Sequence, residues 1–285
     1  MMNEVNYLAA QITERYGTVK RARGCFLYTA KGVRLTDLYQ EAGRAILGWG
    51  GTTAFTVLKN VLSRGITGSF DTDFTPRADS SAKNPLARAV SELLAGERNV
   101  FVFSSKQSAL KLALEIAPQG TSVFRPWSEN VRWSEIDAVI IEPPLAWTQG
   151  IWILAVRPEL PCVVESVRLA APLCAAVTRS IYNLIAALQN RSEKDWFIYD
   201  TVLAKYWTRK GPYLFPKIAK ERYADFVLHC LDCGVVISPV YDQPSIVPFG
   251  ADRGVFAQLR KNPFLLAESV ESIESADSTE SVEKN

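Results

Sequence analysis

The residues whose spacing is best suited to chemistry are Cys230 and Cys233, a lone C-x-x-C that directly follows His229. Two thiols at this spacing could act as a redox pair or supply half of a zinc site. The sequence has no second cysteine or histidine pair at ligand spacing. Two cysteines near the end of a helix are therefore the simpler interpretation, and no metal site is expected.

Several other kinds of chemistry are excluded by composition. His229 is the single histidine, so a catalytic triad that uses histidine and a metal site with several histidines are both ruled out. Lysine is absent from residue 112 to residue 193, although Lys and Arg total 32 in the chain. Any covalent chemistry that needs an amine nucleophile must therefore use a lysine outside this central region.

The overall composition is that of a globular protein. The chain has 285 residues, 48% of them hydrophobic, and a formal net charge of +2. There is no stripe of Arg and Lys with interleaved aromatics, so nucleic-acid binding is not expected. Five cysteines without a regular framework are typical of a reducing cytoplasm, and we expect a cytoplasmic protein. No secretory signal and no uncharged apolar stretch of membrane-spanning length is found, so no membrane is expected.

The first part of the chain contains clear helix and hairpin patterns. Helical spacing predicts helices over 3–16 and 53–62, and Pro85 favours the start of a third helix over 85–95. Residues 25–29 and 33–37 are expected to pair as a hairpin, because Gly32 suits the turn position that needs a positive φ. A polar loop is expected over 71–84.

The central part alternates apolar runs with helical patterns. Strands are expected at 99–103, 121–124, 138–141, 151–156 and 162–164, with helices over 104–116 and 172–188. Alternation of this kind favours a largely parallel sheet with helices on both faces.

The last part is expected to contain helices at 193–206, 218–232 and 252–261 and strands at 234–238 and 245–248. Residues 267–285 hold six acids, one lysine and almost no large apolar side chains. Such a segment cannot bury enough surface to offset its ordering entropy, so we expect a disordered acidic tail.

Five stretches between residues 24 and 240 occur in the order of a known family. They are an opening hairpin at 24–38, I-L-G-W at 46–49, a strand-to-helix turn at 100–109, A-V-I-I-E-P at 138–143, and a helix with a following strand at 223–239. Together they resemble class-III, fold-type I aminotransferases, which depend on pyridoxal phosphate.

The resemblance implies a fold and a division of the chain. The fold class would be α/β: a truncated, three-layer aminotransferase-like domain with a mostly parallel sheet, plus a smaller α+β domain formed by both chain ends. The expected boundaries are 1–65 and 181–266 for the two parts of the small domain, 66–180 for the truncated large domain, and 267–285 for the tail.

The resemblance also places a missing group. The Schiff-base lysine of the family would fall on Glu165, and the glycines that follow it would fall on residues 168–170. A carboxylate cannot form an imine with an aldehyde, so this change removes the covalent anchor and the proton shuttle together. No catalytic residue is therefore expected.

The remaining cofactor contacts are incomplete. The family's phosphate-binding turn would correspond to Ser104, Ser105 and Lys106, with Ser105 in place of a glycine, although Ser104 could simply cap a helix. Trp127 could keep the aromatic residue that stacks on the cofactor ring. The acid that would protonate the ring is absent between Pro143 and Arg157. These four residues, 104–106 and 127, would be at most a vestigial site, and no bound cofactor is expected.

Three functions stay open. The first is a pseudoenzyme that acts by binding or by subunit assembly, as a homodimer or as the partner of an active aminotransferase. The second is a residual pyridoxal-phosphate-dependent transferase that uses an unusual lysine, such as Lys106, Lys111 or Lys194. The third is a small-molecule sensor with a remnant pocket around Ser104, Ser105, Trp127 and Glu142.

Overall fold

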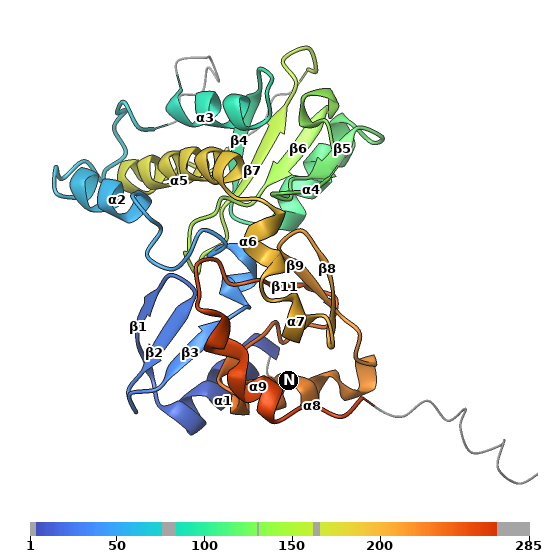
Figure 1. Cartoon of the computed structure of the whole chain (residues 1–285). Helices are drawn as coiled ribbons and strands as arrows, with labels where there is room; N and C mark the ends of the chain where they lie inside the picture. The colour runs from blue at the N-terminus through green and yellow to red at the C-terminus, as the bar shows by residue number, and fades with distance from the viewer. Residues whose placement is uncertain (1–3, 76–83, 130, 162–165, 267–285) are drawn as a thin grey trace, which may run out of the picture.

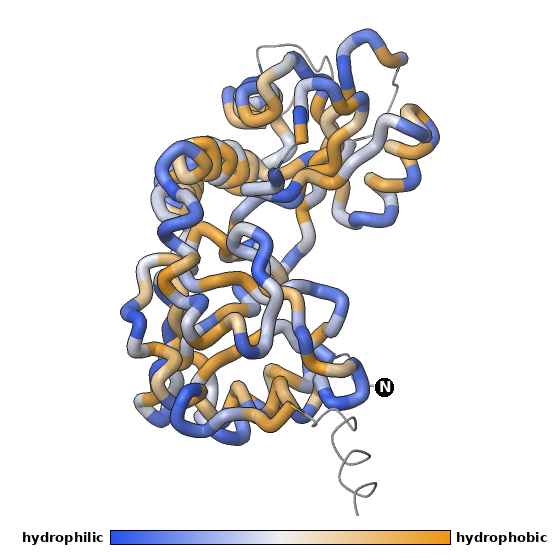
Figure 2. The backbone as a smooth tube through the Cα atoms, turned by 45° about the vertical axis from the view of Figure 1, so that its right-hand side comes forward, coloured by the Kyte–Doolittle hydropathy of each residue, from blue (hydrophilic) through white to orange (hydrophobic). Residues whose placement is uncertain are grey.

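The computed structural model describes residues 4–75, 84–129, 131–161 and 166–266. Its helices and strands fall into two groups, which Figure 1 shows one above the other. The first and last parts of the chain build the lower group, and the middle builds the upper group. Figure 2 shows the apolar segments concentrated inside both groups, with polar segments mainly at the turns around them.

The lower group contains a four-stranded sheet made by both ends of the chain. Its order is β1-β2-β3-β10, with β1 at Val19–Arg23, β2 at Phe26–Thr29, β3 at Arg34–Asp37 and β10 at Val235–Val236. Strands β2 and β3 form the predicted hairpin, and Gly32 in its turn has a φ of 79°. Strand β10 pairs in parallel with β3 and joins the C-terminal part of the chain to the N-terminal hairpin.

A second sheet of the lower group contains one strand within the predicted 245–248 and two strands that were not predicted. It has the order β11-β9-β8, with β8 at Trp207–Lys210, β9 at Tyr213–Pro216 and β11 at Ser245–Ile246. The helix predicted over 193–206 is instead two short helices, α6 at Glu193–Phe197 and α7 at Asp200–Leu203. Tyr199, between them, is buried and donates its hydroxyl to the carbonyl of Ala251 at 2.7 Å, which fixes the break.

The other helices of the lower group close one aromatic-rich core. Trp207, Tyr206 and Phe226 lie in mutual ring contact at its centre. The helices are α1 at Glu4–Tyr16, α8 at Tyr223–Asp232 and α9 at Ala257–Lys261, with 3₁₀ turns at Lys220–Arg222 and Arg253–Phe256.

The upper sheet differs from the predicted one. Its order is β4-β7-β6-β5, with β4 at Asn99–Phe103, β5 at Thr121–Val123, β6 at Ala138–Ile141 and β7 at Trp152–Val156. Only β5 and β6 pair in parallel, and β7 is antiparallel to both of its neighbours. The expectation of a mostly parallel sheet was wrong. Residues 142–151, which join β6 to β7, contain no helix, whereas a parallel connection needs a crossover.

Helices cover both faces of this sheet, as predicted. Helix α4, Lys106–Ile116, packs on one face through Ala109 and Ala113. Helices α3, Pro85–Leu93, and α5, Ala171–Asn190, pack on the other face, and α2, Ala54–Leu62, lies against α5. A 3₁₀ turn at Trp133–Glu135 precedes β6.

The packing of α2 differs from the expected division of the chain into domains. Helix α2 packs on α5 of the upper group, although it falls in the segment 1–65 that we assigned to the small domain. The domain boundaries stay a prediction.

Helix α5 is also long and apolar enough to cross a membrane, but 56% of its most apolar window is buried inside the fold, as in a core helix.

Candidate functional site

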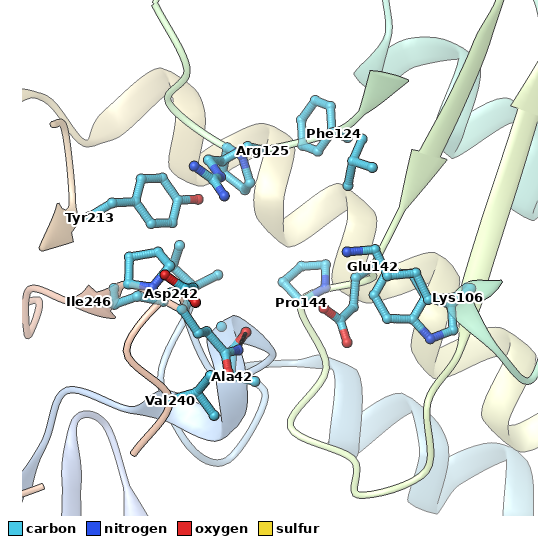
Figure 3. A pocket seen from close by; sticks show the side chains of 17 residues that line it. Ala42, Lys106, Phe124, Arg125, Glu142, Pro144, Tyr213, Val240, Asp242 and Ile246 are labelled. Atoms are coloured by element: carbon cyan, nitrogen blue, oxygen red, sulfur yellow. Dashed lines mark hydrogen bonds between the residues drawn. The ribbon is translucent and has the colours of Figure 1, made fainter. Parts of the chain in front are cut away.

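A pocket of about 430 Å³ lies where the two groups of elements meet (Figure 3). Its walls come from the ends of the upper strands, from the chain between β3 and α2, and from the chain around β11. The lining residues are Ala42, Gly43, Ile46, Lys106, Val123, Phe124, Arg125, Pro126, Glu142, Pro144, Trp152, Tyr213, Val240, Asp242, Gln243, Pro244 and Ile246.

The upper wall is charged. Lys106 is the first residue of α4, and its Nζ lies 5.5 Å from the centroid of the Trp152 ring, which supports a cation–π contact. Glu142 follows directly after β6, so the end of one strand and the start of one helix bring these two charges to the same side of the pocket.

Glu142 is the more constrained of the two. Burial raises the pKa of its carboxyl, and the positive charges of Arg44 and Lys106 oppose that rise. The Nε of Arg44 lies 3.8 Å from Glu142 Oε1 and also donates to the carbonyl of Glu41 at 3.1 Å. Arg44 therefore ties the upper wall to the lower wall.

Arg125 and Tyr213 form the opposite end of the pocket. The guanidinium carbon of Arg125 lies 5.1 Å from the centroid of the Tyr213 ring. Burial raises the pKa of the Tyr213 hydroxyl, and the Arg125 charge opposes this. In Figure 3 that hydroxyl points into the pocket beside Arg125, with Asp242 below it. The lining of the pocket therefore contains two cations, Lys106 and Arg125, and two carboxylates, Glu142 and Asp242.

The lower wall is a backbone turn of unusual conformation. Gln40, Glu41 and Ala42 all have positive φ, at 48°, 52° and 62°, and Gly43 follows at 100°. These residues form the 3₁₀ turn Gln40–Gly43, and Ala42 and Gly43 face the pocket. Three successive residues other than glycine in the left-handed region cost about 1–2 kcal/mol each, so other contacts must hold them there.

Those contacts centre on Asp37, which is 1% exposed. Its Oδ1 accepts hydrogen bonds from the backbone N–H of Tyr39 and of Gln40, both at 2.9 Å, and its Oδ2 accepts one from the indole N–H of Trp49 at 2.6 Å. Burial raises the pKa of this carboxyl from 3.8 to about 6, and the three hydrogen bonds limit the rise.

The residues expected from the sequence are only partly brought together. Lys106 lines the pocket, but Ser104 and Ser105 are not among its lining residues. The cap of α4 is Ser105 rather than Ser104, because its hydroxyl accepts the backbone N–H of Ser108 at 3.2 Å. That hydroxyl occupies an amide at the helix N-terminus that could otherwise bind an anion.

Trp127 lies elsewhere. It borders a second cavity of about 580 Å³, which shares Arg125 and Tyr213 with the first. Its ring meets that of Trp196 edge-on, with 5.5 Å between centroids, and its indole nitrogen is buried without a hydrogen-bond partner. It therefore packs against the core instead of facing Lys106.

Glu165 lies outside the described residues, as do the predicted strand at 162–164 and the predicted tail at 267–285.

Near the C-x-x-C, His229 Nε2 is 3.9 Å from Cys233 Sγ and 2.8 Å from the carbonyl oxygen of Asn262. In the described part of the chain, no group of three or more His, Cys, Asp or Glu side chains could hold a metal ion.

Comparison with known proteins gives two results from sequence. No family model matches the chain. An uncharacterized protein of Treponema pallidum is 28% identical over 286 residues, covering 84% of this chain and 91% of its own length. An uncharacterized protein of Borreliella burgdorferi is 24% identical over 256 residues, covering 87% and 90%.

Solved structures give a clearer result. The fold is similar to an aminotransferase from Bacillus anthracis, with a TM-score of 0.62 and 11% identity over 92% of this chain and 99% of that one. It is also similar to an ornithine aminotransferase from Plasmodium yoelii, with a TM-score of 0.61 and 12% identity over 91% and 97%. The N-acetylornithine aminotransferase of Stenotrophomonas maltophilia gives a TM-score of 0.60 and 14% identity over 90% and 96%. The chain has an aminotransferase-like α/β fold.

Aminotransferases of this kind use pyridoxal phosphate, and the described residues do not fit that cofactor. The amide of Ser108 at the start of α4 is already taken by the hydroxyl of Ser105. Trp127, the expected stacking ring, packs on Trp196 in the second cavity. The carboxylate of Glu142, at the strand end, faces Arg44 and Lys106.

Several pocket residues had not been identified from the sequence. Arg125, Tyr213 and Asp242 line the pocket, and the turn Gln40–Gly43 forms a wall. Arg125 stands directly after the strand run 121–124 and could have been found from that position. Nothing in the local sequence marks the other two, because they come from the second sheet and the chain beside it.

Proposed function

We propose that this protein is a pseudoenzyme: an aminotransferase-like chain that binds a small charged molecule in the pocket without covalent catalysis. The observation that carries the proposal is the mismatch between an aminotransferase-like fold and a pocket whose residues do not fit pyridoxal phosphate. Lys106 is the single lysine among the described lining residues. It lies at the start of α4, far in sequence from the position that the resemblance assigns to the Schiff-base lysine.

The charges of the pocket support non-covalent binding. Lys106 and Arg125 can hold an anionic group, and Glu142 and Asp242 can accept hydrogen bonds from a cationic or polar one. All four side chains line one cavity of about 430 Å³, which suits a molecule of metabolite size. We also propose that this chain is a shortened relative of those enzymes and that it has lost their catalysis.

The test combines a binding screen with a trap for an imine. A thermal-shift screen would use L-glutamate, citrate, adenosine monophosphate and pyridoxamine phosphate as probes, on the wild type and on Arg125→Ala. We expect a saturable shift with at least one probe, and loss of most of it in the variant, because the variant removes one of the two pocket cations. No saturable shift with any probe would overturn the binding role.

The trap separates the pseudoenzyme from a residual transferase. Protein mixed with pyridoxal phosphate is treated with borohydride and digested, and the lysine adducts are then mapped by mass spectrometry. We expect no stoichiometric adduct. Stoichiometric labelling of Lys106 would overturn the proposal and favour the transferase with an unusual lysine. The matched control is Lys111→Ala, since Lys111 is exposed on the same helix and does not line the pocket.

A second candidate role, subunit assembly, is favoured by exposed apolar side chains near α2 and the start of α5. Leu62 is 51% exposed, Phe70 55% and Val167 43%. Arg168 and Asp71, next to two of them, form an ion pair at 2.9 Å that brings the two segments together. We propose a homodimer, or a heteromer with an active aminotransferase, through this surface.

Light scattering tests this assembly. We expect a dimer of the purified chain, and Leu62→Asp combined with Phe70→Asp should yield monomer with an unchanged circular dichroism spectrum. A wild type that is monomeric at all concentrations would contradict the homodimer.

We also propose a cytoplasmic location, supported by four buried free cysteines, Cys25, Cys174, Cys230 and Cys233.

A further inference from the structure

The pocket and the second cavity meet at one pair of residues. The second cavity, of about 580 Å³, adjoins the pocket because Arg125 and Tyr213 line both of them. Lys106 lines the pocket and not the second cavity, whereas Lys210 lines the second cavity and not the pocket. The three cations therefore follow one another along the two joined cavities in the order Lys106, Arg125, Lys210.

These three cations keep their charge available for a ligand. Within the described part of the chain, none of them is in an ion pair. Each lies over an aromatic ring instead: Lys106 at 5.5 Å from the centroid of Trp152, Arg125 at 5.1 Å from that of Tyr213, and Lys210 at 5.9 Å from that of Phe215. A ring attracts a cation without neutralising it, so a negative group of a ligand can still be bound.

Most carboxylates in the same linings are offset by cations outside the row. Three of them form ion pairs, namely Glu142 with Arg44 at 3.8 Å, Asp242 with Lys220 at 3.6 Å, and Glu193 with Arg209. Glu129, which is exposed, is the one lining carboxylate without an ion pair among the described residues. The joined cavities therefore have an excess of positive charge, which favours an anion.

The Tyr213 hydroxyl is the second observation that indicates a ligand. Tyr213 is only 8% exposed, and its hydroxyl has no hydrogen-bond partner among the described residues. Figure 3 shows this hydroxyl pointing into the pocket beside Arg125. Burial raises its pKa, so the hydroxyl keeps its proton at neutral pH and can donate a hydrogen bond. A buried donor without a protein acceptor, next to an unpaired guanidinium, is suited to an anionic oxygen.

The positions of the cations determine the shape of the anion. One small anion can contact Arg125 and the Tyr213 hydroxyl, where the cavities meet. It cannot contact both lysines as well, because Lys106 and Lys210 line different cavities. An anion with several negative groups along a chain can contact all three cations.

We propose that the two cavities form one elongated site for a polyanion, in which Lys106, Arg125 and Lys210 each bind a negative group. The Tyr213 hydroxyl donates to the group that Arg125 binds. The ligand is a linear oligophosphate or oligocarboxylate, since both carry negative oxygens at intervals along a short chain. This inference rests on the proposed function for the presence of a ligand, and it adds the second cavity and the number of charges.

Titration calorimetry on the whole chain tests the elongated site. The salt concentration is about 0.15 M, where attraction to distant surface charges is screened. One series of probes is inorganic phosphate, pyrophosphate and tripolyphosphate, and the other is acetate, succinate and tricarballylate. We expect one site per chain. In at least one series the Kd should fall about tenfold or more from the first probe to the last, because the longer anion also reaches the lysines.

Variants show where the longer probes bind. Lys210→Gln should raise the Kd of the longest probe about tenfold and change that of the shortest by less than about twofold. The matched control is Lys205→Gln, since Lys205 is also exposed over a ring, that of Tyr206, but lines neither cavity. It should bind as the wild type does. Tyr213→Phe keeps the ring and loses the hydroxyl, so it should weaken all probes of the series by a similar factor.

Two results would overturn the proposal. The first is a Kd that does not fall with the number of negative groups in either series. The second is an equal loss of binding in Lys210→Gln and Lys205→Gln, which would indicate a general attraction to surface charge. Lys210 is exposed, so its replacement should leave the circular dichroism spectrum unchanged.

The outcomes also separate this inference from the proposed function. Saturable binding of small probes with no gain from added negative groups would exclude the elongated site alone. Tighter binding of the longer probes together with a stoichiometric imine at Lys106 would exclude the pseudoenzyme alone. No binding of any probe would exclude both.

Discussion

The two walls of the pocket are built on different physical principles. The lower wall, Gln40–Gly43, is strained backbone held in shape by the buried Asp37. The upper wall is relaxed: α4 begins with Ser105 as an ordinary cap, and Lys106 reaches the pocket as an exposed side chain. The lower wall can therefore determine the shape of the pocket, and the upper wall can determine which charges bind there.

The largest expected effect tests the lower wall. Asp37→Ala removes the acceptor of the Gln40 N–H and of the Trp49 indole N–H, whereas the Tyr39 N–H keeps the carbonyl of Val236 at 3.2 Å. We expect the free energy of unfolding to fall by about 4 kcal/mol. Glu142→Ala, the matched carboxylate of the upper wall, should lower it by less than about 1 kcal/mol, since Glu142 keeps partial contact with water. Urea unfolding of both variants measures the difference. Equal losses would remove the contrast between the walls.

The next effect is a pH dependence of stability. The folded-state pKa of Asp37 is raised from 3.8 to about 6, so the native state binds more protons than the unfolded state between these values. The stability that this group contributes is fully present below pH 4 and is lost as the pH rises through 6, by about 3 kcal/mol in all. The measurement is the difference in unfolding free energy between the wild type and Asp37→Asn from pH 4 to pH 7.5. A constant difference would show that Asp37 titrates as an ordinary carboxyl.

A smaller effect is expected at the cap of the upper wall. Ser105→Ala should lower the free energy of unfolding by about 1 kcal/mol because it removes the acceptor for the Ser108 N–H, whereas Ser105→Gly should cost only a few tenths. Urea midpoints of the two variants give the comparison. If both variants lost several kcal/mol, the upper wall would be as dependent on its hydrogen bonds as the lower one.

The smallest effect on stability is expected for the charge itself. Lys106→Ala should change the free energy of unfolding by no more than about 0.5 kcal/mol, since Lys106 is exposed. The same variant should weaken the binding of any anionic probe found in the thermal-shift screen. Lys111→Ala is the control on the same helix. Unchanged probe binding in Lys106→Ala would mean that the upper wall does not determine which charges bind.

Much of the fold could be predicted from local patterns. The hairpin of β2 and β3 follows from two short apolar runs around Gly32, and α3 follows from Pro85 after a capping residue, Asn84, whose side chain accepts the N–H of Leu86. The aminotransferase-like α/β fold was also predicted, and the structural comparisons confirm it at that level.

Features that depend on distant contacts could not be predicted. The direction of β7 is decided by its pairing with β4 and β6, and a five-residue apolar run carries no information about direction. Strands β1 and β8 are rich in charged residues and are stabilised by their neighbours rather than by an apolar pattern.

The candidate site was predicted less well than the fold, for the same reason. Lys106, which was assigned to a vestigial cofactor site at a strand-to-helix turn, lines the pocket, and that site stays a prediction. Trp127 was expected beside it but packs on Trp196, a residue about seventy positions away in sequence whose contact no local pattern reveals. The left-handed turn was missed because the residues that hydrogen-bond to it and beside it, Asp37 and Ile246, lie outside it.

The pairing of β10 with β3 has a consequence for how the molecule is made. Strand β3 is synthesised about two hundred residues before Val235, so this edge stays without its partner until those residues have been made. Ile246, which closes the pocket, emerges later still. The pocket is thus completed only after Ile246 has left the ribosome. Folding is therefore dominated by long-range contacts and should be slow, and any truncated product exposes an open strand edge that is prone to aggregate.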